Sequence, residues 1–476
     1  MTSKRFICLA AMMFNLNIVF GQEAAQLQTA PPQTALPAVV MRISPEEAVD
    51  LAIKNNLSLE RQRVGTDTKR RASANSWNKF LPAVNLSGGA NINSQNSNVT
   101  GDFSTPGMNK QTQDTSSTVF QGQIQLQLAL NFALFEAMNY LKMDYDTGLL
   151  SLEQAKLQME RDVRKSYFNI MLLDEQVKQL QESLQNAEEQ AASARSQYQA
   201  GRQPELNYLQ ARVSVETMRP NIDQALNGLR LAKSNFAMTL GLPLDTDFEL
   251  FLPIEHISYL PIDAKEFTRQ AKNNNPDINV QKQQLRALQS QRKAQFYQKM
   301  TPNLSLGWTN GFSSNDSNVN VDTNLGKTKQ NQNTASSSST FTLGLSWALN
   351  SLLPFSPDAQ SIMDLDDNIK TLSIALAQAE QGMELDVTNK VYSLEQIRSN
   401  IEAQRSTAEL AMRSYNETLT AYNNGLQSLL QVHQANTQLN NARLNLYQQE
   451  SNYLQGLIDL EYSIGAPFGS LMMRTE

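Results

Sequence analysis

The sequence predicts a mainly α-helical protein whose strands belong to a membrane β-barrel. Three observations support this fold class: the chain is internally duplicated, four segments alternate strictly between polar and apolar residues, and two very long helical segments carry seven-residue apolar repeats. The predicted unit is therefore a tandem repeat. Each copy holds two strands and one long antiparallel helical hairpin of the coiled-coil type.

The duplication appears as two halves that can be aligned. SPEEAVDLAIKNN, which begins at Ser44, aligns with DAKEFTRQAKNNN, which begins at Asp263, and later matches keep nearly the same spacing. Each half is predicted to run through a short helix, a longer helix, a strand, a polar loop, a strand, a very long helix, a turn and a returning helix. We expect repeat 1 at residues 44–241, a connector at 242–262, repeat 2 at 263–468 and a tail at 469–476.

The beginning of the chain is predicted to be a secretory signal peptide at residues 1–21. Lys4 and Arg5 precede an apolar run that extends to Phe20, and a plausible cleavage point lies before Gln22. The single cysteine, Cys8, lies inside this segment, so we expect an exported protein without disulfides or a lipid anchor. Residues 22–43, rich in Gln, Ala and Pro, are expected to form a flexible leader.

Composition and motifs argue against several function classes. The net charge of −6 and the lack of a basic cluster predict no nucleic-acid partner. Outside the signal no stretch is apolar over 18 residues, which excludes a spanning helix but not a barrel strand. Neither His256 nor His433 has metal-ligand neighbours, and no phosphate-binding or nucleophile motif occurs. We therefore expect no metal, no cofactor and no enzymatic activity.

Four alternating segments, at about 82–93, 118–131, 302–312 and 340–350, are predicted to be strands. One face of each is uncharged Gln, Asn, Ser or Thr, which suits a water-filled lumen. The long polar segments 94–117 and 313–339 are expected to be loops. The other face is expected to contact outer-membrane lipid and consists of Val84, Leu86, Ile124, Leu126, Leu128, Leu304, Leu306, Trp308, Leu343, Leu345 and Trp347.

Four strands cannot form a closed barrel alone. A single strand of this kind is more often part of a soluble sheet, but four of spanning length favour a membrane wall, and open edges are not tolerated in lipid. Two copies of the chain would supply eight strands and a barrel filled by side chains. Three copies would supply twelve strands and room for an aqueous pore, and we favour three.

The long helical segments are predicted to form two protruding hairpins. The first runs from about residue 133 to 199, turns at Gly201 and returns over 203–240, and the second turns at Gly425 and returns over 427–464. Helix patterns alone would equally suit a stalk. The seven-residue stripes predict coiled-coil packing, and in the descending helices they comprise Val163, Ile170, Val177, Leu184, Ala191, Tyr198, Val387, Leu394, Ile401, Ala408, Tyr415 and Tyr422.

Together these features resemble the TolC family of outer-membrane efflux proteins. The resemblance covers residues 44–468 and rests on the opening SPEEAVDLAIKNN and on Leu81-Pro82 and Thr301-Pro302, which enter the strand pairs. It also rests on the two turn segments, YQAGRQPELNYLQAR from Tyr198 and YNNGLQSLLQVHQAN from Tyr422. Their order, repeated twice, is the specific part of the signal.

The resemblance implies a homotrimer with a twelve-stranded barrel in the bacterial outer membrane and an α-helical tunnel that crosses the periplasm. The connector would then lie in the equatorial region of the tunnel. The channel-tunnel would be a passive conduit for efflux or for export of the type I secretion kind, gated at its periplasmic helix tips. Tyr198, Gly201, Tyr422 and Gly425 would meet a periplasmic adaptor (membrane fusion) protein and, through it, an inner-membrane transporter.

The second turn departs from the family pattern. The better-known members place acidic residues six and nine positions after the second turn glycine, where this chain has Gln431 and Gln434. Asn207 is the corresponding residue of the first turn, and Gln427 stands where the family has an arginine that closes the pore. We therefore expect these four residues to form a neutral periplasmic aperture. The alternative function is a trimeric structural or adhesive stalk anchored in the outer membrane.

Overall fold

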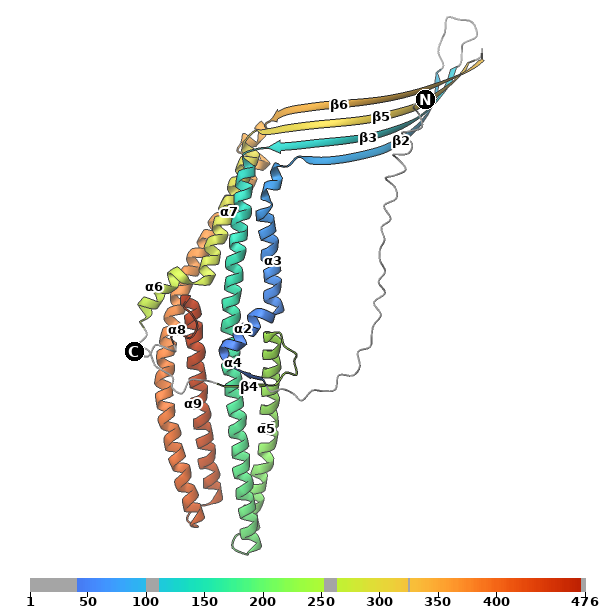
Figure 1. Cartoon of the computed structure of the whole chain (residues 1–476). Coiled ribbons are helices and arrows are strands. Elements are labelled where there is room, and N and C mark those ends of the chain that lie inside the picture. Colours follow the sequence, from blue (N-terminus) through green and yellow to red (C-terminus); the bar gives the residue numbers. More distant parts are fainter. Residues whose placement is uncertain (1–40, 100–110, 252–262, 324–325, 472–476) are drawn as a thin grey trace.

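The computed structural model describes residues 41–99, 111–251, 263–323 and 326–471. The predicted signal peptide lies outside the described residues, as do most of the leader and parts of the connector and tail. In Figure 1 a sheet occupies one end of the molecule, and long helices run from it to two hairpin tips at the other end. The prediction of a mainly helical chain is confirmed.

Each repeat contains the same four main helices and two long strands in the same order. The two descending helices, α4 and α8, each have 67 residues, and the returning helices, α5 and α9, each have 36. At about 1.5 Å per residue the descending helices are roughly 100 Å long. The helices are α2 (Pro45–Asn55), α3 (Leu57–Ala74), α4 (Ala133–Gln199), α5 (Glu205–Leu240), α6 (Ala264–Asn274), α7 (Pro276–Met300), α8 (Pro357–Asn423) and α9 (Leu429–Ile464).

The strands of both repeats form one antiparallel sheet. Its order is β2-β3-β5-β6, so the two repeats meet where β3 pairs with β5. In the described part of this single chain, β2 and β6 are edge strands whose outer sides have no strand partner. The strands are β2 (Ala83–Val99), β3 (Gln111–Leu130), β5 (Asn303–Thr323) and β6 (Gly326–Ser346).

The strands are much longer than the sequence predicted. Residues 94–99, 111–117, 313–323 and 326–339, predicted to be loop, continue the ladders. Apolar alternation is weak there because most residues of both faces are polar, with Val319 and Val321 among the exceptions. The ladder hydrogen bonds come from the backbone and need no apolar side chains. The fourth strand also ends at Ser346, before the predicted 350. Trp347 therefore lies just beyond β6, ahead of the short 3₁₀ helix η2 (Leu349–Leu352).

Part of the predicted leader and part of the connector are ordered. β1 (Met41–Ile43) pairs in parallel with β4 (Phe248–Leu250), which corrects the expectation that 22–43 is flexible throughout. The reason is tertiary, because Ile43 is fully buried and its carbonyl lies 2.8 Å from the hydroxyl of Tyr167 in α4. The same hydroxyl accepts a hydrogen bond from the N–H of Phe251. Three-residue strands are too short for a periodic pattern to reveal.

A repeated junction joins each pair of short helices to its hairpin. Asn56 begins α3 by accepting the N–H of Ser58 and donates 2.8 Å to the carbonyl of Thr239 near the end of α5. In the second repeat Asn275 begins α7 and donates 2.9 Å to the carbonyl of Ser463 near the end of α9. Each side-chain amide thus pairs a free N–H at the start of one helix and a free carbonyl at the end of another.

The hairpins have apolar seams. In α4 the buried stripe of Val163, Ile170 and Val177 gives way towards the tip to Ala187 and Ala194. In the second hairpin the predicted stripe is buried from Val387 to Ala408 and packs against α9. The buried partners from α9 are Tyr453, Leu457, Leu460 and Ile464.

The end of α9 is held by a buried carboxylate. Glu461 is fully buried and accepts the backbone N–H groups of Gly469 and Leu471 at 2.9 and 2.7 Å. Burial raises the pKa of this carboxyl, while the two N–H groups and the charge of Arg164 act in the opposite direction. The first residues of the predicted tail therefore pack on the helix.

Among the described ranges, no helix combines the length and apolar character needed to cross a membrane.

The junction makes a stability prediction. Asn275→Ala removes the cap of α7 and leaves a buried carbonyl of Ser463 unpaired, so we expect the free energy of unfolding to fall by about 1–3 kcal/mol. Asn441→Ala, at an exposed position inside α9, is the matched control and should leave stability unchanged or raise it slightly. Urea unfolding followed by circular dichroism measures both. Equal stabilities would show that the repeated junction is not a structural determinant.

Candidate functional site

The first hairpin tip is a tight turn built around Gly201. The N–H of Arg202 bonds to the carbonyl of Gln197, and the N–H of Gly201 bonds to that of Tyr198, both at 2.9 Å. This is the Schellman arrangement, which places the residue after the cap in the left-handed region. Gly201 has φ of 68°, and a Cβ there would meet no atom within 4 Å. The glycine is needed for backbone conformation and leaves an open surface.

The second tip repeats this geometry. The N–H of Leu426 bonds to the carbonyl of Ala421 at 2.8 Å, the N–H of Gly425 bonds to that of Tyr422 at 2.9 Å, and Gly425 has φ of 75°. In both tips the hydrogen bond from the glycine N–H to the tyrosine carbonyl therefore sets the three-residue spacing between them. Both glycines are required for the left-handed backbone of the turns, and their role in docking remains a prediction.

The two tip tyrosines have different surroundings. Tyr198 is 39% exposed and stacks on Tyr208 of α5, with ring centroids 6.4 Å apart and planes 6° from parallel. Tyr422 packs instead against a small cluster in which Ala194 and Leu429 are buried, and this cluster joins the two hairpins. Its buried hydroxyl has no hydrogen-bond partner among the described residues. Tyr198 is thus more available to a partner than Tyr422.

Sequence reasoning missed an apolar surface at the tips. Leu206, Leu209 and Val213 lie at i, i+3 and i+7 in the first turns of α5 and are 61%, 47% and 63% exposed. Leu426 and Leu430 extend this surface on the second tip, where they are 78% and 61% exposed. The helical spacing was visible in the sequence, but their exposure depends on how the hairpins pack.

The predicted aperture residues lie beside the turns and use their amides differently. The side-chain oxygen of Gln431 accepts the N–H of Ser428 at 2.9 Å and completes a capping box at the start of α9. The side-chain amide of Asn207 donates to the side-chain oxygen of Gln203, four residues earlier, at 3.0 Å. Gln427 and Gln434 are exposed. A single chain does not bring these four residues around one opening, so the neutral aperture remains a prediction.

One titratable group lies close to the second tip. His433 is half-buried in α9, and burial lowers the pKa of its imidazole. The ring is therefore neutral at pH 7, and its Nε2 has no hydrogen-bond partner in the part of the chain that the structure describes. The region close to the second turn is thus dominated by neutral hydrogen-bonding groups, whereas the first turn carries Arg202 and Glu205.

The predicted lipid-facing residues of the sheet share one face. In antiparallel pairs, opposed residues point to the same side, and the register opposes Val84 to Leu126, and Leu126 to Trp308. It likewise places the other predicted strand residues, from Leu86 to Leu345, on this face. Trp308 donates its indole N–H to Ser339 at 3.0 Å, while Trp347 lies outside the strand.

The apolar face has a definite extent. It begins in the row Leu130–Leu304–Leu345 beside the helices and ends near Phe120 and Phe312, which are 52% and 53% exposed. Beyond this boundary most of the aligned residues are polar on both faces, with Ile92, Val319 and Val321 among the exceptions.

The described residues contain no group of three His, Cys, Asp or Glu side chains that could hold a metal ion.

The turn geometry predicts a local effect of glycine replacement. Gly201→Ala or Gly425→Ala forces an L-residue into the left-handed region, at a cost of about 1–2 kcal/mol. We expect the amides of Arg202 and Leu426 to exchange roughly tenfold faster in hydrogen–deuterium exchange. Gly382→Ala, inside α8 with open space around it, is the matched control and should slow local exchange. Unchanged protection at the tips would contradict the turn assignment.

Solved structures share this fold at low sequence identity. The Campylobacter jejuni CmeC outer membrane channel matches with a TM-score of 0.69 and 15% identity, over 91% of this chain and 87% of that chain. The open state of the Neisseria gonorrhoeae MtrE outer membrane channel matches with a TM-score of 0.65 and 15% identity, over 89% of each. The Vibrio cholerae outer membrane protein VceC matches with a TM-score of 0.64 and 14% identity, over 89% of this chain and 96% of that one.

The family itself is shown by sequence. A comparison with curated proteins finds no match. The family model of outer membrane efflux proteins, in contrast, matches residues 48–241 and 268–466, which are most of the two repeats. Proteins of this family are bacterial outer-membrane efflux channels and not enzymes, which confirms the expected absence of catalysis. The chain therefore belongs to the outer membrane efflux protein family, the TolC family.

Proposed function

We propose that three copies of this chain form a closed channel that conducts cargo across the outer membrane. The observation that carries this proposal is the four-stranded sheet, which has one apolar face and two unpaired edges and continues into the helical hairpins. Edge strands cannot remain unpaired in lipid, so β6 of one copy would pair with β2 of the next. Twelve strands then close with space for water.

The dimensions of the apolar face suit a bilayer. In β5 it runs from Leu304 to Phe312, nine residues that span about 30 Å along the strand at roughly 3.3 Å each. With the usual barrel tilt its height is about 23 Å, close to the apolar band of outer-membrane barrels. The polar outer parts of the strands would then extend the barrel beyond the lipid.

The helices supply the second part of the proposed channel. Apolar side chains of α8 point away from their own protomer, and Ile374, Leu385 and Tyr392 are 51%, 63% and 61% exposed. Packing against a neighbouring copy would cover them and close a tunnel of six hairpins in the periplasm. We propose that the tunnel is passive and that partners drive transport, since the sequence carries no phosphate-binding motif.

The tips are the proposed contact with those partners. The exposed Leu206, Leu209 and Leu426, together with the stacked Tyr198, form an apolar surface at the end of each hairpin. We propose that a periplasmic adaptor covers this surface and connects the channel to an inner-membrane transporter. The alternative, a structural or adhesive stalk, would leave the tips without such a partner.

Crosslinking in cells tests this contact. Photoreactive residues at Gln203 and Gln427, beside the two turns, should capture a periplasmic adaptor. The same photoreactive residue at Gln396, an exposed position of α8 well above the tip, is the position control and should not capture the adaptor. Capture of copies of this chain alone, with correct outer-membrane insertion, would favour the stalk.

A neutral aperture predicts weak block by cations. Gln431→Glu keeps the capping box, and with Gln434→Glu it adds one pair of carboxylates per copy at the proposed opening. We expect multivalent cations to block single-channel current at concentrations lower by roughly tenfold or more, because close carboxylates attract them strongly. Glu402→Gln, on the exposed part of α8, controls for a general change of charge. Unchanged block would remove these residues from the aperture.

A further inference from the structure

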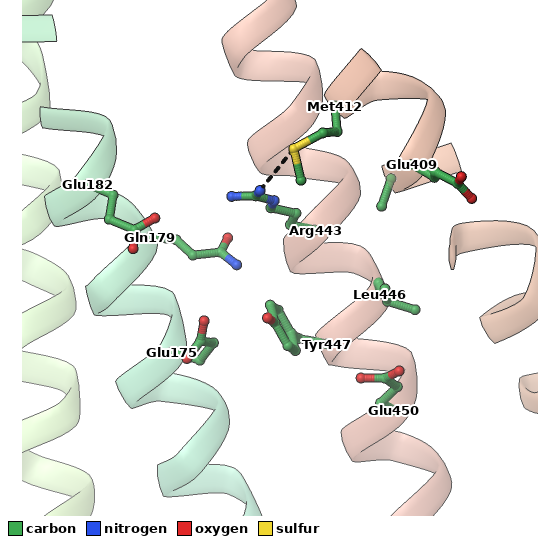
Figure 2. Close-up of a pocket in the computed structure, with 10 residues that line it drawn as sticks. Glu175, Gln179, Glu182, Glu409, Met412, Arg443, Leu446, Tyr447 and Glu450 are labelled. Carbon is green, nitrogen blue, oxygen red and sulfur yellow. Dashed lines mark hydrogen bonds between the residues drawn. The ribbon is translucent and has the colours of Figure 1, made fainter. Parts of the chain in front are cut away.

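A groove between the two hairpins is lined mainly by charged and polar side chains. It has a volume of about 660 Å³ and is lined by residues of α4, α8 and α9 (Figure 2). This volume is within the range of pockets that bind small molecules. Its lining has four carboxylates, those of Glu175, Glu182, Glu409 and Glu450, and one guanidinium, that of Arg443.

The carboxylates are only partly neutralised. Glu450 pairs with Arg405 at 3.3 Å, but no ion pair of the described residues joins Arg443 to any carboxylate of the groove. Arg443 instead donates to the sulfur of Met412 at 3.4 Å. Figure 2 shows its guanidinium between Met412 and Gln179. The groove therefore has an excess of negative charge, and the one cation of its lining is weakly engaged.

A buried and unpaired acceptor points into the same space. Gln179 is 5% exposed, and its Oε1 has no hydrogen-bond partner among the described residues. In Figure 2 its amide extends from α4 towards α9, between Arg443 and Tyr447. An unpaired buried amide oxygen is costly, and a ligand with N–H donors would satisfy it.

The remaining surface suits an apolar stem and a positive charge. Leu446, Ala408 and Met412 contribute aliphatic contacts, and Tyr447 contributes an aromatic ring that is 37% exposed. Burial raises the pKa of the Tyr447 hydroxyl, and the charges of Glu175 and Glu450 raise it further, so the ring stays neutral. Neutral aromatic faces beside carboxylates bind organic ammonium and guanidinium groups.

We propose that this groove binds a small organic cation, an alkylammonium or guanidinium compound with a short apolar stem. The carboxylates of α4 and α9 hold the charge, Gln179 accepts an N–H, and the aliphatic side chains cover the stem. This assignment does not depend on the proposed conduction, because occupancy can be measured on the purified protein.

The test uses the full-length protein in lipid nanodiscs and isothermal titration calorimetry. Hexamethylenediamine is the probe, and hexanediol, which has the same stem without charge, is the matched ligand. We expect saturable binding of the diamine that weakens with added salt, and no binding of the diol. Absence of saturable diamine binding, or equal binding of the diol, overturns the proposal.

Four variants identify the site. Glu175→Gln and Gln179→Leu should each weaken diamine binding by roughly three- to tenfold, while Arg443→Gln, which removes the cation of the lining, should tighten it. Glu402→Gln, on the outer face of α8, should have no effect. Because Glu175 is on the groove surface, its variant reports binding even if Gln179→Leu alters folding. Equal affinities in all variants would show that the measured heat of diamine binding comes from general surface charge, and would overturn the proposal.

Discussion

The architecture depends on one close contact, made twice, between the end of a returning helix and the bend between two short helices. At the end of α5, Gly241 has φ of 71°, and a Cβ there would lie 2.6 Å from the carbonyl oxygen of Asn55. Gly465 at the end of α9 approaches Asn274 in the same way. The neighbouring asparagines, Asn56 and Asn275, then bond across the contact. Only glycine permits this approach, and the contact fixes each hairpin relative to the helices that enter the sheet.

The two repeats share the backbone geometry of their junctions and tips, whereas the side chains around these features differ. Both tips use the same Schellman turn, but one presents a stacked tyrosine pair and the other packs its partly buried tyrosine against a cluster that joins the hairpins. The first repeat also gains the small β1–β4 pair, anchored by Tyr167. Backbone geometry is therefore common to the repeats, and the surfaces through which they could recognise partners differ.

Features that repeat locally in the chain could be predicted from the sequence. The long helices follow from seven-residue stripes, and the turns from glycine after a helical run. The apolar strand segments follow from period-two alternation. These signals are local, so they survive without knowledge of the fold.

Features that depend on tertiary contacts could not be predicted from the sequence. The outer halves of the strands carry little apolar alternation, because most of their residues are polar and the backbone supplies the ladder hydrogen bonds, and β1 is too short to show any period. The pairing of β1 depends on Tyr167, which lies over a hundred residues away in the chain. At the candidate site, the tip glycines and the Ser428-x-x-Gln431 spacing of the capping box are visible in the sequence, whereas the exposure of Leu206 and Leu209 depends on how the hairpins pack.

The packing also separates two kinds of interface in the helical part. Within the second hairpin, Leu394 and Ile401 contact apolar residues of α9 in a continuous buried cluster. Between the hairpins, α4 and α9 meet through polar pairs such as Lys165–Asp459 and Ser183–Asn440, both at 2.7 Å. They also meet through two small apolar clusters, one formed by Phe168, Leu454 and Ile458 and the other close to the tips. Apolar seams resist separation, whereas polar pairs can exchange their partners for water at little net cost. Apolar contact between the hairpins is thus confined to clusters smaller than those that hold each hairpin together.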